Sequence, residues 1–273
     1  MGETWPETTP AGEPGDGPGS LRGRTLRERS LRMARFIGCD LRDVVVRGSD
    51  VAGMEIDSPW LLEAGHRLLV NGVDVVPLVD AELNWRFPGR ELRCADDPEG
   101  LREAWAALEE TWAATVDRAL GMPEGTVDVS VDGEWSFAQT LRHLVLATDL
   151  WLGRAVLGRE DPFHPAGLAH DGDGSAASDA LPLSPEPPSF DEVLAARADR
   201  QAMVRRFIAG VTANDLAARR RNPHAPEHPE TVLSCVRTIL EEEWEHHRYA
   251  VRDLDALAAG LTGRISTPGP PGP

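Results

Sequence analysis

Apolar side chains recur in steps of three and four residues over most of the chain after residue 97, which is the period of a helix with one buried face. The first such stretch starts at Asp97 and Pro98, an N-cap residue followed by proline in the first turn. Further stretches run from Ser136 to about Leu157, from Ser189 through Ile208, and from about Thr231 to Ala259. Four long helices in this order predict an up-and-down four-helix bundle.

Three segments have the composition of tails or loops. Residues 1–20 and 263–273 are rich in Gly and Pro and are predicted to be disordered tails. A similar stretch at about 160–188 is predicted to be a long loop that carries the one long crossover of the bundle. The third long helix follows it with a capping box, Ser189 and Glu192.

A connecting segment, residues 59–96, precedes the bundle, which we assign to residues 97–262. The apolar run from Val73 to Phe87 in this segment predicts one helix, with Pro77 in its first turn.

A different period marks residues 21–58. Apolar side chains recur there at every fifth position, namely Leu26, Leu31, Phe36, Leu41, Val46, Val51 and Ile56. This spacing resembles the pentapeptide repeat family, whose fold is a right-handed square β-helix with one repeat per side. Seven repeats form fewer than two coils, so we expect the stack to rely on the rest of the protein. An irregular strand-rich segment with accidental spacing is the alternative.

The charge of the chain excludes several classes of function. It has 28 basic and 45 acidic residues, a net charge of -17, and every basic residue is Arg. Without Lys there is no Schiff-base enzyme, no Walker A loop and no protein-kinase active site. A charge this negative argues against general nucleic-acid binding, because such binding requires phosphate neutralisation.

The cellular environment is indicated by what the chain lacks. It has no apolar run long enough for a membrane span and no signal-peptide core at its start. Its three cysteines, Cys39, Cys94 and Cys235, are far apart. They indicate a reducing cytoplasm and neither a disulfide framework nor a thiolate metal site.

The fourth predicted helix carries two ionisable residues within its apolar row, Glu243 and His247. Being four residues apart, they share one face of the helix. A buried carboxylate needs a metal, a partner charge or a water-filled cleft as compensation. His143, on the apolar second helix, could complete a two-histidine, one-carboxylate set for Zn²⁺ or another divalent ion. A hydrogen-bonded core histidine and a simple Glu243–His247 pair are the alternatives.

Other candidate side chains are open to two interpretations. Arg197 and Arg200 on the third helix could bind an anionic substrate, or could belong to a solvated face. Trp244 could form the floor of a substrate pocket, or could be part of the bundle core. Glu242 and His246 are also four residues apart, but they lie off the apolar row and are interpreted as a surface pair. No residue is assigned a catalytic role.

The sequence Glu243-Trp244-Glu245-His246-His247-Arg248-Tyr249, preceded by Glu134-Trp135-Ser136 and Arg142-His143-Leu144, resembles the DinB/YfiT-like superfamily over about residues 97–260. That family implies a four-helix bundle whose metal is held by one histidine on the second helix and an i,i+4 pair on the fourth. Many members use three histidines. The carboxylate of Glu243 in place of one of them resembles the mycothiol-dependent maleylpyruvate isomerase branch, which uses His, Glu and His on zinc. The resemblance therefore implies His143, Glu243 and His247 as ligands.

The same resemblance implies a metal-dependent enzyme, a transferase or isomerase, that uses a low-molecular-weight thiol such as mycothiol. A divalent ion lowers the pKa of a bound thiol and so stabilises its thiolate. We expect a small-molecule substrate and a thiol as partners, with a homodimer left open. Two alternatives remain: a non-catalytic binding or scaffold protein that uses the repeat segment, and a hydrolase whose metal activates water.

Overall fold

The computed structural model describes residues 21–63, 65–169, 183–184 and 186–260. The tails expected at 1–20 and 263–273 lie outside the described residues, as does most of the loop expected at about 160–188. Contacts divide the described chain into two units, residues 21–59 and residues 60–260.

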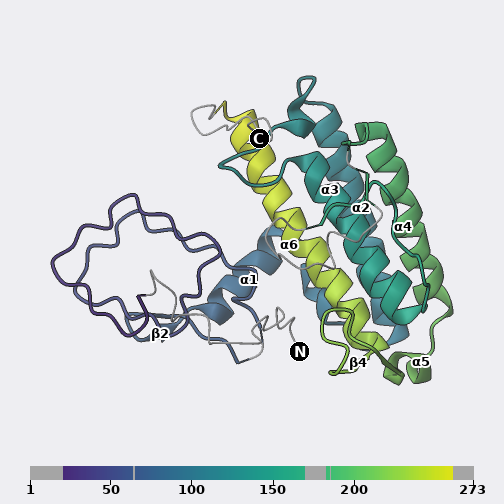
Figure 1. Ribbon diagram of the computed structural model, residues 1–273, viewed down its shortest axis with the longest axis horizontal. Helices are drawn as coiled ribbons and strands as arrows, with labels where there is room; N and C mark the ends of the chain where they lie inside the picture. Colours follow the sequence, from purple (N-terminus) through teal and green to yellow (C-terminus); the bar gives the residue numbers. More distant parts are fainter. Residues whose placement is uncertain (1–20, 64, 170–182, 185, 261–273) are drawn as a thin grey trace. The chain divides into compact units, whose positions relative to one another are not determined.

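Four long helices pack side by side in the larger unit (Figure 1). They are α2 (Pro98–Leu120), α3 (Phe137–Thr148), α4 (Phe190–Gly210) and α6 (Val232–Ala258). Both α2 and α3 contact α4 and α6, so each of the four helices has two neighbours. The expectation of a mainly helical fold built on four long helices is confirmed.

Side-chain caps determine where these helices begin. Asp97 accepts hydrogen bonds from two backbone N–H groups at the start of α2. Capping boxes start α3, with Ser136 and Gln139, and α4, with Ser189 and Glu192. These caps satisfy N–H groups that have no partner inside the helix, which is why the starts were readable from local sequence.

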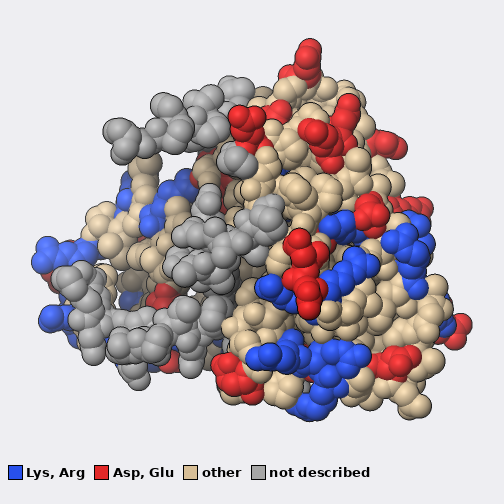
Figure 2. Space-filling view, turned by 45° about the vertical axis from the view of Figure 1, so that its right-hand side comes forward, with Lys and Arg blue, Asp and Glu red and all other residues tan. Residues whose placement is uncertain are grey.

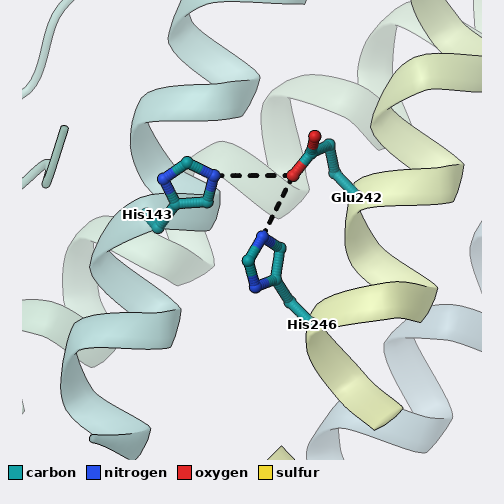
Figure 3. A group of neighbouring side chains, drawn as sticks. All are labelled: His143, Glu242 and His246. Atoms are coloured by element: carbon teal, nitrogen blue, oxygen red, sulfur yellow. Dashed lines mark ion pairs between the residues drawn. The ribbon is translucent and has the colours of Figure 1, made fainter. Parts of the chain in front are cut away.

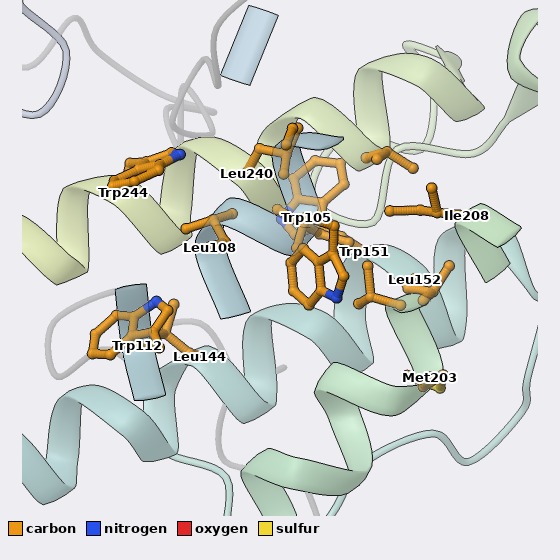
Figure 4. Packing of buried hydrophobic residues seen from close by; sticks show 14 of the residues in the cluster. Trp105, Leu108, Trp112, Leu144, Trp151, Leu152, Met203, Ile208, Leu240 and Trp244 are labelled. Carbon is orange, nitrogen blue, oxygen red and sulfur yellow. The ribbon is translucent and has the colours of Figure 1, made fainter. Parts of the chain in front are cut away.

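The core contains apolar side chains from all four helices (Figure 4). Its large members, each at most 4% exposed, include Trp105, Leu108, Trp112, Leu144, Trp151, Leu152, Met203, Ile208, Leu240 and Trp244. Burial of one such side chain contributes about 1.5–3 kcal/mol relative to leaving it exposed. Cys235 is buried in the same core, and all three cysteines are free thiols.

The second long helix changes its geometry at Asp149. α3 ends at Thr148 and continues directly as a π-helix, η3 (Asp149–Val156). The expected extent, to about Leu157, is correct, but regular α-helical geometry covers only its first part. A π-helix is rare because its i→i+5 hydrogen bonds widen the backbone, and it often marks a functional region.

The segment before the bundle contains a hairpin as well as a helix. Strands β1 (Leu69–Val70) and β2 (Val73–Asp74) pair antiparallel, and α1 (Val76–Arg86) follows. The helix expected over 73–87 therefore begins later than predicted, because Val73 and Asp74 are hydrogen-bonded to the first strand. The remaining short elements are η1 (Arg90–Cys94), η2 (Thr126–Asp128), α5 (Ala213–Ala217) and the antiparallel strands β3 (Arg219–Arg220) and β4 (Glu230–Thr231).

The backbone of residues 21–59 repeats every five residues. Positive φ angles of 52° to 76° occur at Gly23, Glu28, Met33, Gly38, Asp43, Gly48 and Gly53. The apolar side chains of the five-residue pattern, Leu26 through Ile56, are 49–54% exposed. These described residues contain no β-strand, so the β-helix expected here is not shown.

Charged side chains of both signs share the surface of the helical unit. On the face drawn in Figure 2, arginines lie among acidic side chains over the lower half of the view. Ion pairs also join helices of this unit at its surface, such as Arg205 with Glu109 and Arg118 with Asp255. Within the described ranges, no helix combines the length and the apolar character needed to cross a membrane.

Candidate metal centre

Two helices bring together His143, Glu242 and His246 (Figure 3). One ligand atom from each side chain lies within 4.8 Å of the others. The Nε2 atoms of His143 and His246 are 3.4 Å and 3.1 Å from the same Glu242 oxygen. In the part of the chain that the structure describes, this is the one group of three such residues with the spacing of a metal site. It has the two-histidine, one-carboxylate composition expected from the sequence, but shares only His143 with the expected set.

The ring of His143 is oriented by a backbone carbonyl. Its Nδ1 lies 3.3 Å from the oxygen of Leu168, and because that oxygen can only accept, Nδ1 carries the proton. Nε2 of His143 then faces the Glu242 carboxylate, which has only lone pairs to offer. A proton or a cation is needed between them, so the donor set fits a divalent ion such as Zn²⁺.

The charge state of the group also suits metal binding. Burial raises the pKa of Glu242, but hydrogen bonds from His143 and His246 outweigh this and hold the pKa well below its usual value. Burial lowers the pKa of His246, against the opposing effect of Glu242. An ionised carboxylate and a neutral imidazole are the forms that coordinate metals. The three side chains are 16–20% exposed, so the group remains in contact with solvent.

Aromatic rings surround the two histidines. The ring of Trp135 lies 4.7 Å from that of His143 and 5.9 Å from that of His246, and Tyr249 meets His246 at 6.0 Å. Trp135 also lines a small, mainly apolar pocket. The other residues of this pocket are Val129, Phe137, Thr140, Ala250, Asp253, Leu254 and Leu257. The group thus has an apolar wall on one side, and a pocket shares this wall.

Glu243, expected to be a ligand, lies elsewhere. Its side chain is 1% exposed and forms an ion pair with Arg197 of α4. Burial raises the pKa of Glu243, and Arg197 opposes that rise. A partner charge was one of the compensations considered for this carboxylate, and it is the one found. The same pair accounts for Arg197, which is buried and therefore not on a solvated face.

His247, the other expected ligand, is enclosed by the core. Its Nε2 lies 2.8 Å from the hydroxyl of Thr115, and the rings of Phe87, Trp112 and Trp244 surround it at 5.0–5.9 Å. Burial lowers the pKa of His247 to about 4, so the ring is neutral at pH 7. His247 is thus a hydrogen-bonded core histidine whose partner is Thr115, whereas Glu243, its partner in the alternative interpretation, pairs with Arg197.

The two other expected substrate contacts are also buried. Arg200 is 8% exposed and pairs with Asp149, which is fully buried at the start of η3. Trp244 is 1% exposed and belongs to the core cluster. Neither side chain reaches the group formed by His143, Glu242 and His246.

Glu242 and His246 were interpreted from the sequence as a surface pair because they lie one residue off the apolar row of α6. The structure corrects this, because the adjacent face of α6 meets His143 of α3. A signal was present in the sequence: a metal site must admit its ion, so the less apolar of two neighbouring i,i+4 pairs is the better candidate.

Comparison with known proteins gives one match. A sequence model described as the DinB superfamily matches residues 107–250, which is more than half of the 273 residues. The matched region extends from α2 to α6 and includes all three residues of the group. Neither the curated proteins nor the solved structures gave a match.

Proposed function

The chain belongs to the DinB superfamily, and on that premise we propose that His143, Glu242 and His246 hold a divalent metal ion, zinc being the best fit to two imidazoles and one carboxylate. The observation that carries this proposal is the convergence of three potential ligand atoms, one each from His143, Glu242 and His246, within 4.8 Å of one another. When bound, such an ion lowers the pKa of a coordinated thiol or water and so supplies a nucleophile at neutral pH.

The residues around the group prepare it for this role. The Leu168 carbonyl holds the His143 ring with Nε2 directed inward. Glu242 supplies the negative charge that offsets part of the charge of the ion. Trp135 excludes water from one side of both imidazole rings, which strengthens the electrostatic interactions there.

We propose further that the nucleophile is the thiol of a small cosubstrate such as mycothiol, used for S-transfer or isomerisation. None of the three cysteines belongs to the metal-ligand group. Burial raises the pKa of the Cys235 thiol to about 12, so this residue provides no thiolate at neutral pH. We therefore assign the thiol to a cosubstrate.

Elemental analysis and cobalt titration of the full-length protein test the metal site. Wild type is expected to bind one ion per chain, and His143→Ala is expected to lose it. His228→Ala, which changes a 79% exposed side chain in a loop, is the matched control and should bind as wild type does. A wild-type protein that binds no divalent ion, or a His143→Ala protein that binds normally, would contradict the proposal.

Thermal unfolding tests the thiol. A ligand of the native state raises the melting temperature, so mycothiol should stabilise zinc-loaded wild type and leave metal-free protein unchanged. If zinc stabilises the protein and mycothiol has no further effect, the result would favour a hydrolase whose metal activates water.

We also propose that residues 21–58 are a short array of pentapeptide repeats and serve as an interaction surface. Support comes from the left-handed backbone at every fifth residue and from the half-exposed apolar side chains between those positions. A chain lacking residues 1–58 should keep its metal affinity if the array serves only interactions. A loss of metal from that shortened chain would contradict this division of roles.

A further inference from the structure

Residues 162–168, called the strap below, follow η3 and are bound to the bundle at both ends. At the far end, the Leu168 carbonyl accepts the hydrogen bond from His143 Nδ1. Next to it, the Leu168 N–H donates to the carbonyl of Arg142, at 3.2 Å. The guanidinium of Arg142 donates in turn to the carbonyls of Ala166 and Gly167, at 3.0 Å and 3.3 Å. The strap thus ends on the candidate metal ligand and on the residue before it.

The near end of the strap is held by a buried ion pair, Asp149 with Arg200. Nε of Arg200 donates to one oxygen of Asp149, while Nη2 donates to the other, at 3.2 Å. Both partners also bind the strap backbone. The His164 N–H donates to Asp149 at 2.8 Å, and Arg200 Nη2 donates to the Pro162 carbonyl at 3.2 Å.

The π-helix supplies the space in which the strap lies. Asp149 is its first residue, and Gly153 faces the strap. A Cβ atom at Gly153 would lie 2.7 Å from the Cβ of Pro162, closer than side chains approach one another. The strap can therefore lie against η3 only because this position lacks a side chain.

A stability role alone does not account for the buried pair. Removing charges from water is unfavourable for each ion. Proteins in which a buried ion pair is replaced by apolar residues are therefore often as stable as the original. In this pair, however, each partner also forms a hydrogen bond with the strap backbone, and an apolar side chain could not form that bond. The pair determines the path of the strap, and the strap determines the orientation of the His143 ring.

We propose that Asp149 and Arg200 are positioning residues for the metal ligand His143, acting through the strap. This inference rests on the metal site proposed above. Carbonyl partners of metal-bound histidines set the tautomer and ring orientation, and their loss typically lowers metal affinity about 10–100-fold. Asp149 and Arg200 hold the end of the strap opposite to Leu168. They thereby act on the hydrogen bond between His143 Nδ1 and the Leu168 carbonyl.

The decisive variant is Asp149→Leu/Arg200→Met, which removes both charges and leaves no unpaired ion in the core. Full-length protein is titrated with Co²⁺, and the visible absorption of the bound cobalt is recorded. We expect the dissociation constant to rise about 10–100-fold, with an altered cobalt spectrum. Arg205→Met, which breaks an exposed ion pair on the same helix, is the matched control and should leave both unchanged.

Gly153→Ala serves as a second variant, because it displaces Pro162 without altering any charge and remains informative if the double variant does not fold. It should weaken cobalt binding in the same direction. The proposal is overturned if cobalt affinity and spectrum are unchanged in both variants. If the double variant does not fold, an unchanged result in Gly153→Ala alone overturns it.

A metal-free measurement separates this inference from the metal site itself. The ¹⁵N shifts of the His143 ring should report an Nδ1–H tautomer in wild type and a mixture of tautomers in the variants. A wild-type protein that binds no cobalt refutes the metal site alone. A tautomer that is the same in wild type and variants refutes the positioning role.

Discussion

Glu242 and Glu243 are consecutive residues of α6, yet their carboxylates contact different helices. Glu242 meets the imidazole of His143 on α3, whereas Glu243 meets the guanidinium of Arg197 on α4. Successive side chains of an α-helix are rotated by about 100°, so neighbouring residues face different partners. The same rotation separates His246, in the candidate metal group, from His247, in the core.

Substitution of the two neighbouring histidines should have opposite effects. His246→Ala is expected to lose metal with a smaller loss of stability, because its side chain is 16% exposed and not enclosed by the core. His247→Ala is expected to retain metal but to lose stability, because it empties a site enclosed by three aromatic rings. Cobalt titration and urea unfolding of both variants measure the two effects. The reverse result would restore the ligand set expected from the sequence.

Breaking the buried pair of Arg197 and Glu243 should be costly only when one partner remains. Arg197→Met leaves a carboxylate uncompensated in the core, and we expect a loss of about 3–5 kcal/mol in the free energy of unfolding. Arg197→Met/Glu243→Leu removes both charges and should recover most of that loss. Equal destabilisation in the single and double variants would show that the pair matters for packing rather than for charge.

The stability of the protein should fall in acid partly through His247. Burial disfavours the charged imidazole and lowers the pKa of His247 from about 6.5 in the unfolded chain to about 4 in the folded protein. Between these values the unfolded state binds more protons. The contribution of His247 to the free energy of unfolding is therefore complete above pH 6.5. It declines by about 3 kcal/mol as the pH falls to 4.

Urea unfolding at a series of pH values measures this decline. His247→Gln should flatten the profile between pH 6.5 and 4, whereas His228→Gln in an exposed loop should not. If the profile of His247→Gln were as steep as that of wild type, the loss of stability in acid would come from other groups.

Backbone strain in residues 21–59 can be tested at two equivalent turns. Met33 and Gly53 have φ angles of 65° and 76°. Each precedes a residue whose N–H closes the turn: Ala34 donates to the Leu31 carbonyl, and Met54 donates to the Val51 carbonyl. A non-glycine residue costs roughly 1 kcal/mol in this conformation. Met33→Gly should therefore stabilise its turn, and Gly53→Ala should destabilise the other by a similar amount.

Hydrogen exchange of the Ala34 and Met54 amides reports the two turns separately. Nothing lies within 4 Å of a Cβ added at Gly53, so any loss there is conformational and not a clash. If both substitutions left exchange unchanged, these turns would not be formed in solution.

Local sequence was enough to place most of the helices. Asp97, Ser136 and Ser189 cap helices through hydrogen bonds to residues two or three positions away, so their meaning does not depend on the rest of the fold. The steps of three and four similarly identified the face of α6 that lies in the core. The five-residue pattern likewise predicted the period of the backbone in residues 21–59, but the β-helix that we expected from it is not shown.

The start of α1 and the geometry after Thr148 were not readable in this way. Val73 and Asp74 belong to a hairpin that competes with the helix for the same residues. The π-helix at Asp149 carries the pairing with Arg200 and accommodates the strap, both of which come from distant parts of the chain. Local propensity says nothing about partners of this kind.

By itself, the sequence determined that a carboxylate and a histidine four residues apart on the last helix needed a partner, and that His143 on an apolar helix needed one as well. Two such pairs are offset by one residue, and only packing decided which of them meets His143. The rotation of α6 about its axis is set by the fit of its apolar row into the core. That fit directs Glu243 and His247 inward and turns Glu242 and His246 toward α3.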